Sequence, residues 1–271
     1  MKVQNRIDPL KSTVIPKQAS TVIILRQAID RGHGPFEVLM VRRHADSLFV
    51  PDCYVFPGGC IDDDDCSQES ASFCSELDRQ KAFQILGDMP TEEMALGAWV
   101  AAVRETFEET GIMLSSGFHD PDTLARCRRK LLKGEIKFTD ILKRGKWTLS
   151  IGGLRYFAHW ITPEPLPYRY DVRFFVTVMP ANQEATHDGI ELTGFTWITP
   201  RQALAEYQQN RFKMVLPTIM TLRELGHFDS IDAVIQSVKT KIVPSILTKL
   251  AEKDGRIVEA MPDGKFFSAV L

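Results

Sequence analysis

The sequence has no long apolar run, little excess of either charge and no paired cysteine motif. No stretch approaches the roughly 18–20 apolar residues that a membrane-spanning helix needs, and segment 1–17 lacks the apolar core of a signal peptide. The 33 basic residues nearly balance the 35 acidic ones, for a formal charge of −2. We therefore expect a cytoplasmic protein that binds neither nucleic acid nor membrane as its main task.

The cysteines indicate neither a disulfide framework nor a zinc site. They number five, an odd count, and none are spaced as C-x-x-C. Four of them lie between positions 53 and 74, which leaves a metal or redox role open. Reduced thiols are the simpler interpretation. The residues are Cys53, Cys60, Cys66, Cys74 and Cys127.

Strand and helix patterns follow one another along the chain. We predict strands over 20–25, 36–42, 154–162, 171–179 and 194–198, and a closing strand pair at 257–259 and 265–268. Helical patterns cover 67–86, 91–110, two pieces within 121–146, 202–208 and most of 212–253. Thr91 is a suitable N-cap and Gly111 a suitable terminator for the helix between them. This mixture predicts helices layered on a sheet.

Acidic residues cluster at the end of the helix over 91–110. Glu105, Glu108 and Glu109 stand at positions i, i+3 and i+4, so their carboxylates share one face. Three like charges so close repel one another unless a cation lies among them. Carboxylate oxygens suit Mg²⁺ or Mn²⁺. The alternative is a solvated acidic face with Arg104 as a salt-bridge partner.

The segment R104-E-T-F-E-E-T-G-I112 resembles the second half of the Nudix box, G-x5-E-x7-R-E-U-x-E-E-x-G-U, and F56-P-G-G59 resembles its opening turn. Gly59 and Arg104 lie 45 positions apart instead of 14, so 31 residues are inserted. Such a split box is similar to the Nudix subgroup that includes the peroxisomal coenzyme A diphosphohydrolases and bacterial relatives. Two positions depart from the box: Thr106 replaces its aliphatic residue and Leu96 replaces its first glutamate.

The resemblance implies an α+β fold, an α/β/α sandwich around a mixed sheet. It covers roughly residues 19–225, which we take as the Nudix domain, with an insert at about 62–93 inside the box. Residues 226–271 are expected to form a helical extension packed on the same domain. The expected activity is hydrolysis of a diphosphate linkage in a small molecule, with Mg²⁺ (or Mn²⁺) as cofactor.

Site roles carried over from the family fall on matching positions. The implied metal ligands are Glu105, Glu108, Glu109 and the Gly58 carbonyl, and Arg104 would orient the loop and the acids. A further acid from a later loop is assigned to Glu191, six residues before Trp197. The general base is left open between Glu105 and Glu191. The full expected set is catalytic Glu105, Glu109, Glu191 and Arg104, and substrate-binding Arg43, Gly59 and Arg173.

The substrate is less well indicated. Coenzyme A-directed relatives often carry L-L-T-x-R-[SA]-x3-R-x3-G-x3-F-P-G-G, and here Arg43 matches the first arginine, but Leu48 and Asp52 replace the second arginine and the glycine. Coenzyme A or an acyl derivative is therefore one option beside dinucleotides, nucleotide sugars and nucleoside triphosphates. The basic stretch 126–146 would either bind a second phosphate or form a solvated face.

Two alternatives to a monomeric hydrolase stay open. A Nudix-fold module could bind a nucleotide as a regulator without cleaving it, although such modules typically lose box glutamates that this chain keeps. The insert or the C-terminal part could also support a homodimer.

Overall fold

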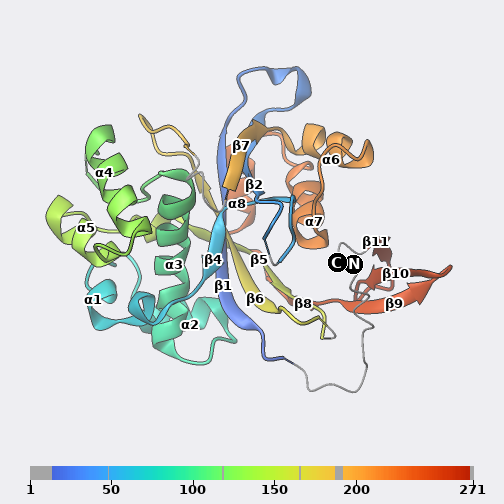
Figure 1. Ribbon diagram of the computed structural model, residues 1–271, viewed down its shortest axis with the longest axis horizontal. Coiled ribbons are helices and arrows are strands. Elements are labelled where there is room, and N and C mark those ends of the chain that lie inside the picture. Colours follow the sequence, from blue (N-terminus) through green and yellow to red (C-terminus); the bar gives the residue numbers. More distant parts are fainter. Residues whose placement is uncertain (1–13, 48, 118, 165, 187–191, 269–271) are drawn as a thin grey trace.

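The computed structural model describes residues 14–47, 49–117, 119–164, 166–186 and 192–268 (Figure 1). Its strands are β1 (Lys17–Gln27), β2 (Phe36–Arg43), β3 (Tyr54–Val55), β4 (Gly58–Cys60), β5 (Arg155–Ile161), β6 (Tyr170–Val178), β7 (Leu192–Ile198), β8 (Ser245–Leu247), β9 (Lys249–Lys253), β10 (Arg256–Ala260) and β11 (Phe266–Ser268). Its helices are α1 (Gln68–Ala71), α2 (Arg79–Leu86), α3 (Glu92–Thr110), α4 (Pro121–Leu132), α5 (Phe138–Gly145), α6 (Pro200–Gln208), α7 (Leu216–Leu225) and α8 (Ile231–Ser237).

One mixed sheet forms the centre of the molecule. Its strands run in the order β3-β2-β1-β6-β5-β8, with β4 also paired to β1 and β7 to β2. β1 is parallel to β6 and β5 is parallel to β8, whereas the other neighbours in this sheet are antiparallel. β9, β10 and β11 form a separate three-stranded sheet.

Helices cover both faces of the central sheet, with α1–α5 on one side and α6 and α7 on the other (Figure 1). Successive residues of β1 point to opposite faces, so Val22 and Ile24 pack toward α3, while Ile23 and Leu25 pack toward α7 and α8. All four side chains are fully buried, which explains the nearly unbroken apolar run of this strand. The predicted α/β/α sandwich is confirmed.

Helix α3 has the ends predicted from the sequence. The Thr91 side chain accepts a hydrogen bond from the Met94 amide, and Gly111 ends the helix at φ 74°, in the left-handed region that favours glycine. Both departures from the box, Leu96 and Thr106, are buried. Leu96 belongs to the hydrophobic core on this face of the sheet. The helix therefore presents its carboxylates from a rigid, packed support.

The insert is a packed part of this same layer. The helical pattern predicted over 67–86 is interrupted, because α1 stops at Ala71 and α2 begins only after Asp78, whose side chain accepts a hydrogen bond from the Lys81 amide. Between them the Phe73 carbonyl accepts a hydrogen bond from the Leu149 amide, 2.9 Å away. The segment between the two helices is therefore bound to a part of the chain that is distant in sequence. Ala82, Leu86 and Met89 join the core beneath α3.

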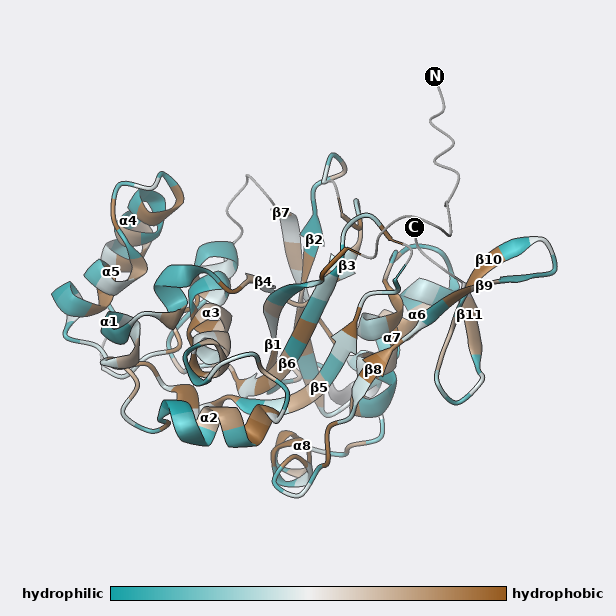
Figure 2. Cartoon of the chain, turned by 90° about the horizontal axis from the view of Figure 1, so that it is seen from below, coloured by the Kyte–Doolittle hydropathy of each residue, from teal (hydrophilic) through white to brown (hydrophobic). Residues whose placement is uncertain are grey.

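The C-terminal segment corrects a sequence prediction. Only α7 and α8 are helical within 212–253, and from Ser245 onward the described chain is built mainly of strands. The predicted closing strand pair is confirmed as β10 and β11. β8 extends the central sheet beside β5, which is why the local pattern did not reveal it: its partner lies more than 80 positions earlier. Figure 2 shows β9 and β10 projecting beyond α7 with a hydrophilic tip.

Two further expectations can be compared with the described part of the chain. None of its helices combines the length and the apolar character that crossing a bilayer requires. All five cysteines, each of which lies in the described ranges, are free thiols.

Candidate active site

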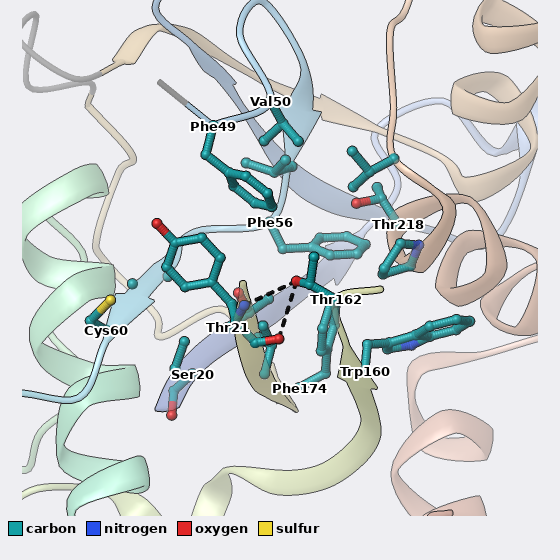
Figure 3. Close-up of a pocket in the computed structure, with 18 of the residues that line it drawn as sticks. Ser20, Thr21, Phe49, Val50, Phe56, Cys60, Trp160, Thr162, Phe174 and Thr218 are labelled. Carbon is teal, nitrogen blue, oxygen red and sulfur yellow. Dashed lines mark hydrogen bonds between the residues drawn. The ribbon is translucent and has the colours of Figure 1, made fainter. Parts of the chain in front are cut away.

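A cavity of about 510 Å³ lies where β1, β4, the end of α3 and the start of α7 meet. One end is acidic and is lined by Asp62, Glu105, Glu108 and Glu109 beside the first residues of β4. The other end is mainly apolar, and Figure 3 shows Phe49, Phe56, Trp160 and Phe174 gathered around it. A ligand filling this cavity would therefore meet two kinds of surface, one charged and one aromatic.

The Arg104 guanidinium contacts most of the polar groups at the acidic end. Its guanidinium donates to both carboxylate oxygens of Asp65, at 2.9 and 2.8 Å, and to the Cys60 carbonyl at 2.9 Å. The same group lies 2.9 Å from Glu105 Oε1 and 3.1 Å from Glu108 Oε2. This side chain thus links the insert, β4 and the acidic face of α3.

Gly58 and Gly59, the first two residues of β4, permit close approach to α3. The Gly58 amide donates to Glu109 Oε2 at 2.9 Å. A Cβ added to Gly59 would lie 2.4 Å from the Glu105 carboxyl carbon, so any larger residue would displace that carboxylate. A Cβ on Gly58 would lie 2.2 Å from the Ser20 carbonyl oxygen, which belongs to the backbone of β1. Both positions require glycine for steric reasons.

Burial changes the proton affinities at this end. It raises the pKa of Glu105 to about 7, although the charge of Arg104 opposes the shift. Burial likewise raises the pKa of Glu108. For Arg104, burial alone would lower the pKa, but the hydrogen bonds to Asp65 and the charge of Glu105 outweigh it, so its pKa is raised and it stays protonated.

The arrangement of the three box glutamates differs from the simple convergence predicted from their spacing. Arg104 contacts both Glu105 and Glu108, and Glu109 turns to the Gly58 amide. Among the described residues, no set of three or more His, Cys, Asp or Glu side chains already surrounds one point as metal ligands would. Helix periodicity places side chains on one face, but their tips follow the nearest available partner.

The donor chemistry of this end nevertheless fits a hard divalent cation. Four carboxylates, those of Asp62, Asp65, Glu105 and Glu108, lie within 3.4 Å of the single guanidinium of Arg104. One positive charge among four negative ones leaves a local deficit of positive charge. All the side-chain donors are oxygens, the kind that Mg²⁺ and Mn²⁺ prefer. The metal assignment itself remains a prediction.

Arg43 and Gly59 both line the cavity, as expected for substrate-binding residues. Arg43 Nε is buried and has no hydrogen-bond partner in the described part of the chain, so a ligand acceptor could satisfy it. Asp52, which replaces the glycine of the coenzyme A-directed pattern, has φ 58°, the left-handed conformation that glycine favours. Arg42 and Lys213 hold its carboxylate in place. Leu48, the other substitution, lies outside the described residues.

Arg173 does not line this cavity, contrary to the sequence prediction. Its side chain is completely buried and lies 2.8 Å from Asp88 and 2.9 Å from Asp171. His159, also buried, contacts the same two carboxylates. Its Nδ1 also shares a hydrogen bond with the Ser245 hydroxyl. Alternation along β6 turns Arg173 away from the cavity and toward the insert. The structure therefore assigns Arg173 to a buried ionic network instead of a substrate contact.

Part of the basic stretch 126–146 interacts with the protein itself. Lys137 pairs with Asp64, and Lys143 pairs with Glu69, so the acids of the insert compensate part of its charge. Arg128 is buried and donates to the Glu108 carbonyl at 2.8 Å, at the end of α3. These contacts favour a solvated surface that pairs with neighbouring acids over a second phosphate site for the stretch 126–146. They also show that Arg128 supports the end of α3.

Glu191, the predicted acid of the later loop, lies outside the described residues. Other residues beside the site are not in the predicted set. Asp65 belongs to the acidic run 62–65, and its pairing with Arg104 becomes visible only in the fold. Trp160 and Phe174 line the cavity but also belong to the hydrophobic core, so their residue types alone do not distinguish the two roles.

Comparisons with known proteins agree with this site. A family model described as the NUDT19 Nudix domain matches residues 78–225. The acyl-coenzyme A diphosphatase NUDT19 of Xenopus laevis is 24% identical across 304 aligned positions, covering 91% of this chain and 79% of that protein. The protein of the same name from Gallus gallus is 23% identical over 262 positions, covering 80% of this chain and 69% of its own length.

A solved structure shares the fold. The crystal structure of a NUDIX hydrolase from Alicyclobacillus acidocaldarius aligns with a TM-score of 0.64 and 25% identity, over 83% of this chain and 97% of that one. The family match spans more than half of the chain and contains the acidic helix α3, and the fold agrees with it independently. The chain therefore belongs to the Nudix hydrolases, in the family that carries the NUDT19 Nudix domain.

Proposed function

We propose that this Nudix hydrolase cleaves the diphosphate linkage of coenzyme A or acyl-coenzyme A in a Mg²⁺-dependent reaction. The observation that carries the proposal is the two-ended cavity, acidic beside Gly58 and Gly59 and aromatic beside Phe56 and Trp160. A diphosphate attached to a slender, partly apolar arm matches both surfaces. The printed names of the Xenopus laevis and Gallus gallus relatives support the same substrate class.

The residues of the acidic end would have different roles in the reaction. Glu105, Glu108, Glu109 and the Gly58 carbonyl would hold the metal, and Arg104 would keep the carboxylates in place. When bound, a divalent ion supplies charge neutralisation for the phosphates and acidifies a water molecule. Glu105 or Glu191 would accept the proton of the attacking water. Arg43, with its buried and unpaired Nε, would contact the substrate.

A regulatory module that binds without cleaving remains the second candidate. The presence of Glu105, Glu108 and Glu109 around one cavity supports hydrolysis, because a module that only bound its ligand would have no need for several buried, repelling acids.

The test is a substrate panel with Mg²⁺. Coenzyme A, acyl-coenzyme A, NADH, ADP-ribose, nucleotide sugars and nucleoside triphosphates are incubated with the protein, and the products are identified by mass. We expect coenzyme A to give adenosine 3′,5′-bisphosphate and 4′-phosphopantetheine, with one water added across the diphosphate. EDTA should abolish this and Mg²⁺ or Mn²⁺ restore it. Cleavage of other compounds only would refute the coenzyme A assignment, and binding without cleavage of any would favour the regulatory module.

A further inference from the structure

The C-terminal strands supply part of the cavity wall. Thr248 and Glu259 both line the cavity, although they come from a segment that lies beyond the family match at 78–225. Thr248 follows β8, which pairs with β5 so that Leu247 stands opposite Ile161. Glu259 lies on β10, opposite Leu250 of β9. Figures 1 and 2 place β8 and β10 on the other side of the central strands from α3, which carries the box glutamates.

Glu259 is a half-buried carboxylate without a positively charged partner among the described residues. Thr248, itself 1% exposed, donates its hydroxyl hydrogen bond to Glu259 Oε1. No lysine or arginine of the described residues pairs with Glu259, and burial raises its pKa. The same cavity is also lined by Trp160, Phe174 and Leu216, from β5, β6 and α7. Thr248 thus holds one oxygen of the Glu259 carboxylate, in a cavity that several apolar side chains also line.

We infer that Glu259, held in position by Thr248, is a specificity-determining residue that accepts a hydrogen bond from an amide N–H or hydroxyl group of the substrate's non-nucleotide arm. This rests on the proposed function. A donor on the ligand would satisfy the remaining acceptor capacity of the carboxylate, which the protein leaves unpaired. A single carboxylate among apolar side chains cannot hold a metal ion by itself. A neutral arm with amide and hydroxyl donors, such as pantetheine, fits the surrounding aromatic wall.

The test compares two substrates that share a diphosphate and differ in the arm. Coenzyme A carries the arm, and the methyl ester of 3′-phospho-ADP does not. We expect Glu259→Ala to lower kcat/KM for coenzyme A about ten- to a hundredfold relative to the methyl ester, mainly through KM, as loss of a hydrogen bond to a charged group predicts. Glu259→Gln keeps an acceptor oxygen and should recover part of the loss. Glu252→Ala, an exposed acid on the neighbouring strand β9, is the matched control.

The outcomes separate this inference from the proposed function. Melting temperatures of all variants identify any loss that comes from unfolding, and Glu259→Gln retains the contact with Thr248 if Glu259→Ala does not fold. Wild-type cleavage of coenzyme A, with the same substrate ratio in the Glu259 and Glu252 variants, would overturn the inference alone. A wild-type protein that cleaves no coenzyme A would overturn both.

Discussion

Replacing Arg173 by methionine tests the buried ionic network. Arg173 is completely buried, and its guanidinium lies 2.8 Å from Asp88 and 2.9 Å from Asp171. Methionine has a similar length but no charge, so both carboxylates lose their cation. Asp171 is the more enclosed of the two, with a side chain 13% exposed against 41% for Asp88. The main penalty therefore comes from Asp171, which loses its arginine and keeps hydrogen bonds with His159 and Gln18.

Removing one partner of a buried ion pair costs about 3–5 kcal/mol. At about 2–4 °C per kcal/mol for a domain of this size class, we expect the melting temperature of Arg173→Met to fall by about 6–20 °C. Calorimetry measures this fall, and enzyme assays below the transition measure KM. Because Arg173 lies outside the cavity, KM should stay within about twofold of the wild type. Arg155→Met, an exposed arginine on β5, is the matched control.

The opposite pattern would refute this reasoning. If Arg173→Met kept its melting temperature and raised KM about tenfold, Arg173 would have to contact the substrate, as the sequence first suggested.

Three further predictions concern the active site and the network. Glu108→Gln and Glu109→Gln should each lower turnover about a hundredfold or more at saturating Mg²⁺, with nearly unchanged circular dichroism, because both keep the shape of the side chain. Gly59→Ala should lower turnover about tenfold by displacing the Glu105 carboxylate, whereas Gly58→Ala should mainly lower the melting temperature, because its Cβ meets backbone. Burial alone would raise the pKa of Asp171, but its hydrogen bond with His159 and the charge of Arg173 lower it overall, so its stabilisation is present above its ordinary pKa of 3.8 and is lost as the pH falls through the lowered value. The melting temperature of Asp171→Asn should accordingly fall less steeply below pH 4 than that of the wild type, and parallel curves would contradict this.

Local signals were enough to predict the supporting helix of the site. Thr91 and Gly111 mark the ends of α3 by side-chain capping and by left-handed backbone, both of which depend on near neighbours in sequence. The nearly unbroken apolar run that predicts β1 is likewise a local signal. The glycine pair is visible in the sequence, but the predicted turn at 58–59 is the start of strand β4, in which Gly58 and Gly59 pair with Thr21 and Ser20 of β1.

Long-range contacts account for what could not be predicted. Arg173 looks like a free cation on a strand until Asp88, 85 positions earlier, is brought beside it. β8 becomes a strand because the exposed edge of β5 offers hydrogen bonds, which no property of Ser245–Leu247 announces. The tips of Glu105 and Glu108 follow Arg104, and only the folded backbone decides where that guanidinium lies.

The network around Arg173 also limits how the chain could be shortened. Asp88 belongs to the segment that separates the two halves of the box, yet it supplies one of the carboxylates that neutralise a cation inside the sheet. A deletion that restored the usual spacing of the box would strip that cation of half its compensation. Loop trimming, the ordinary engineering route to a smaller scaffold, would here have to be accompanied by an apolar replacement of Arg173.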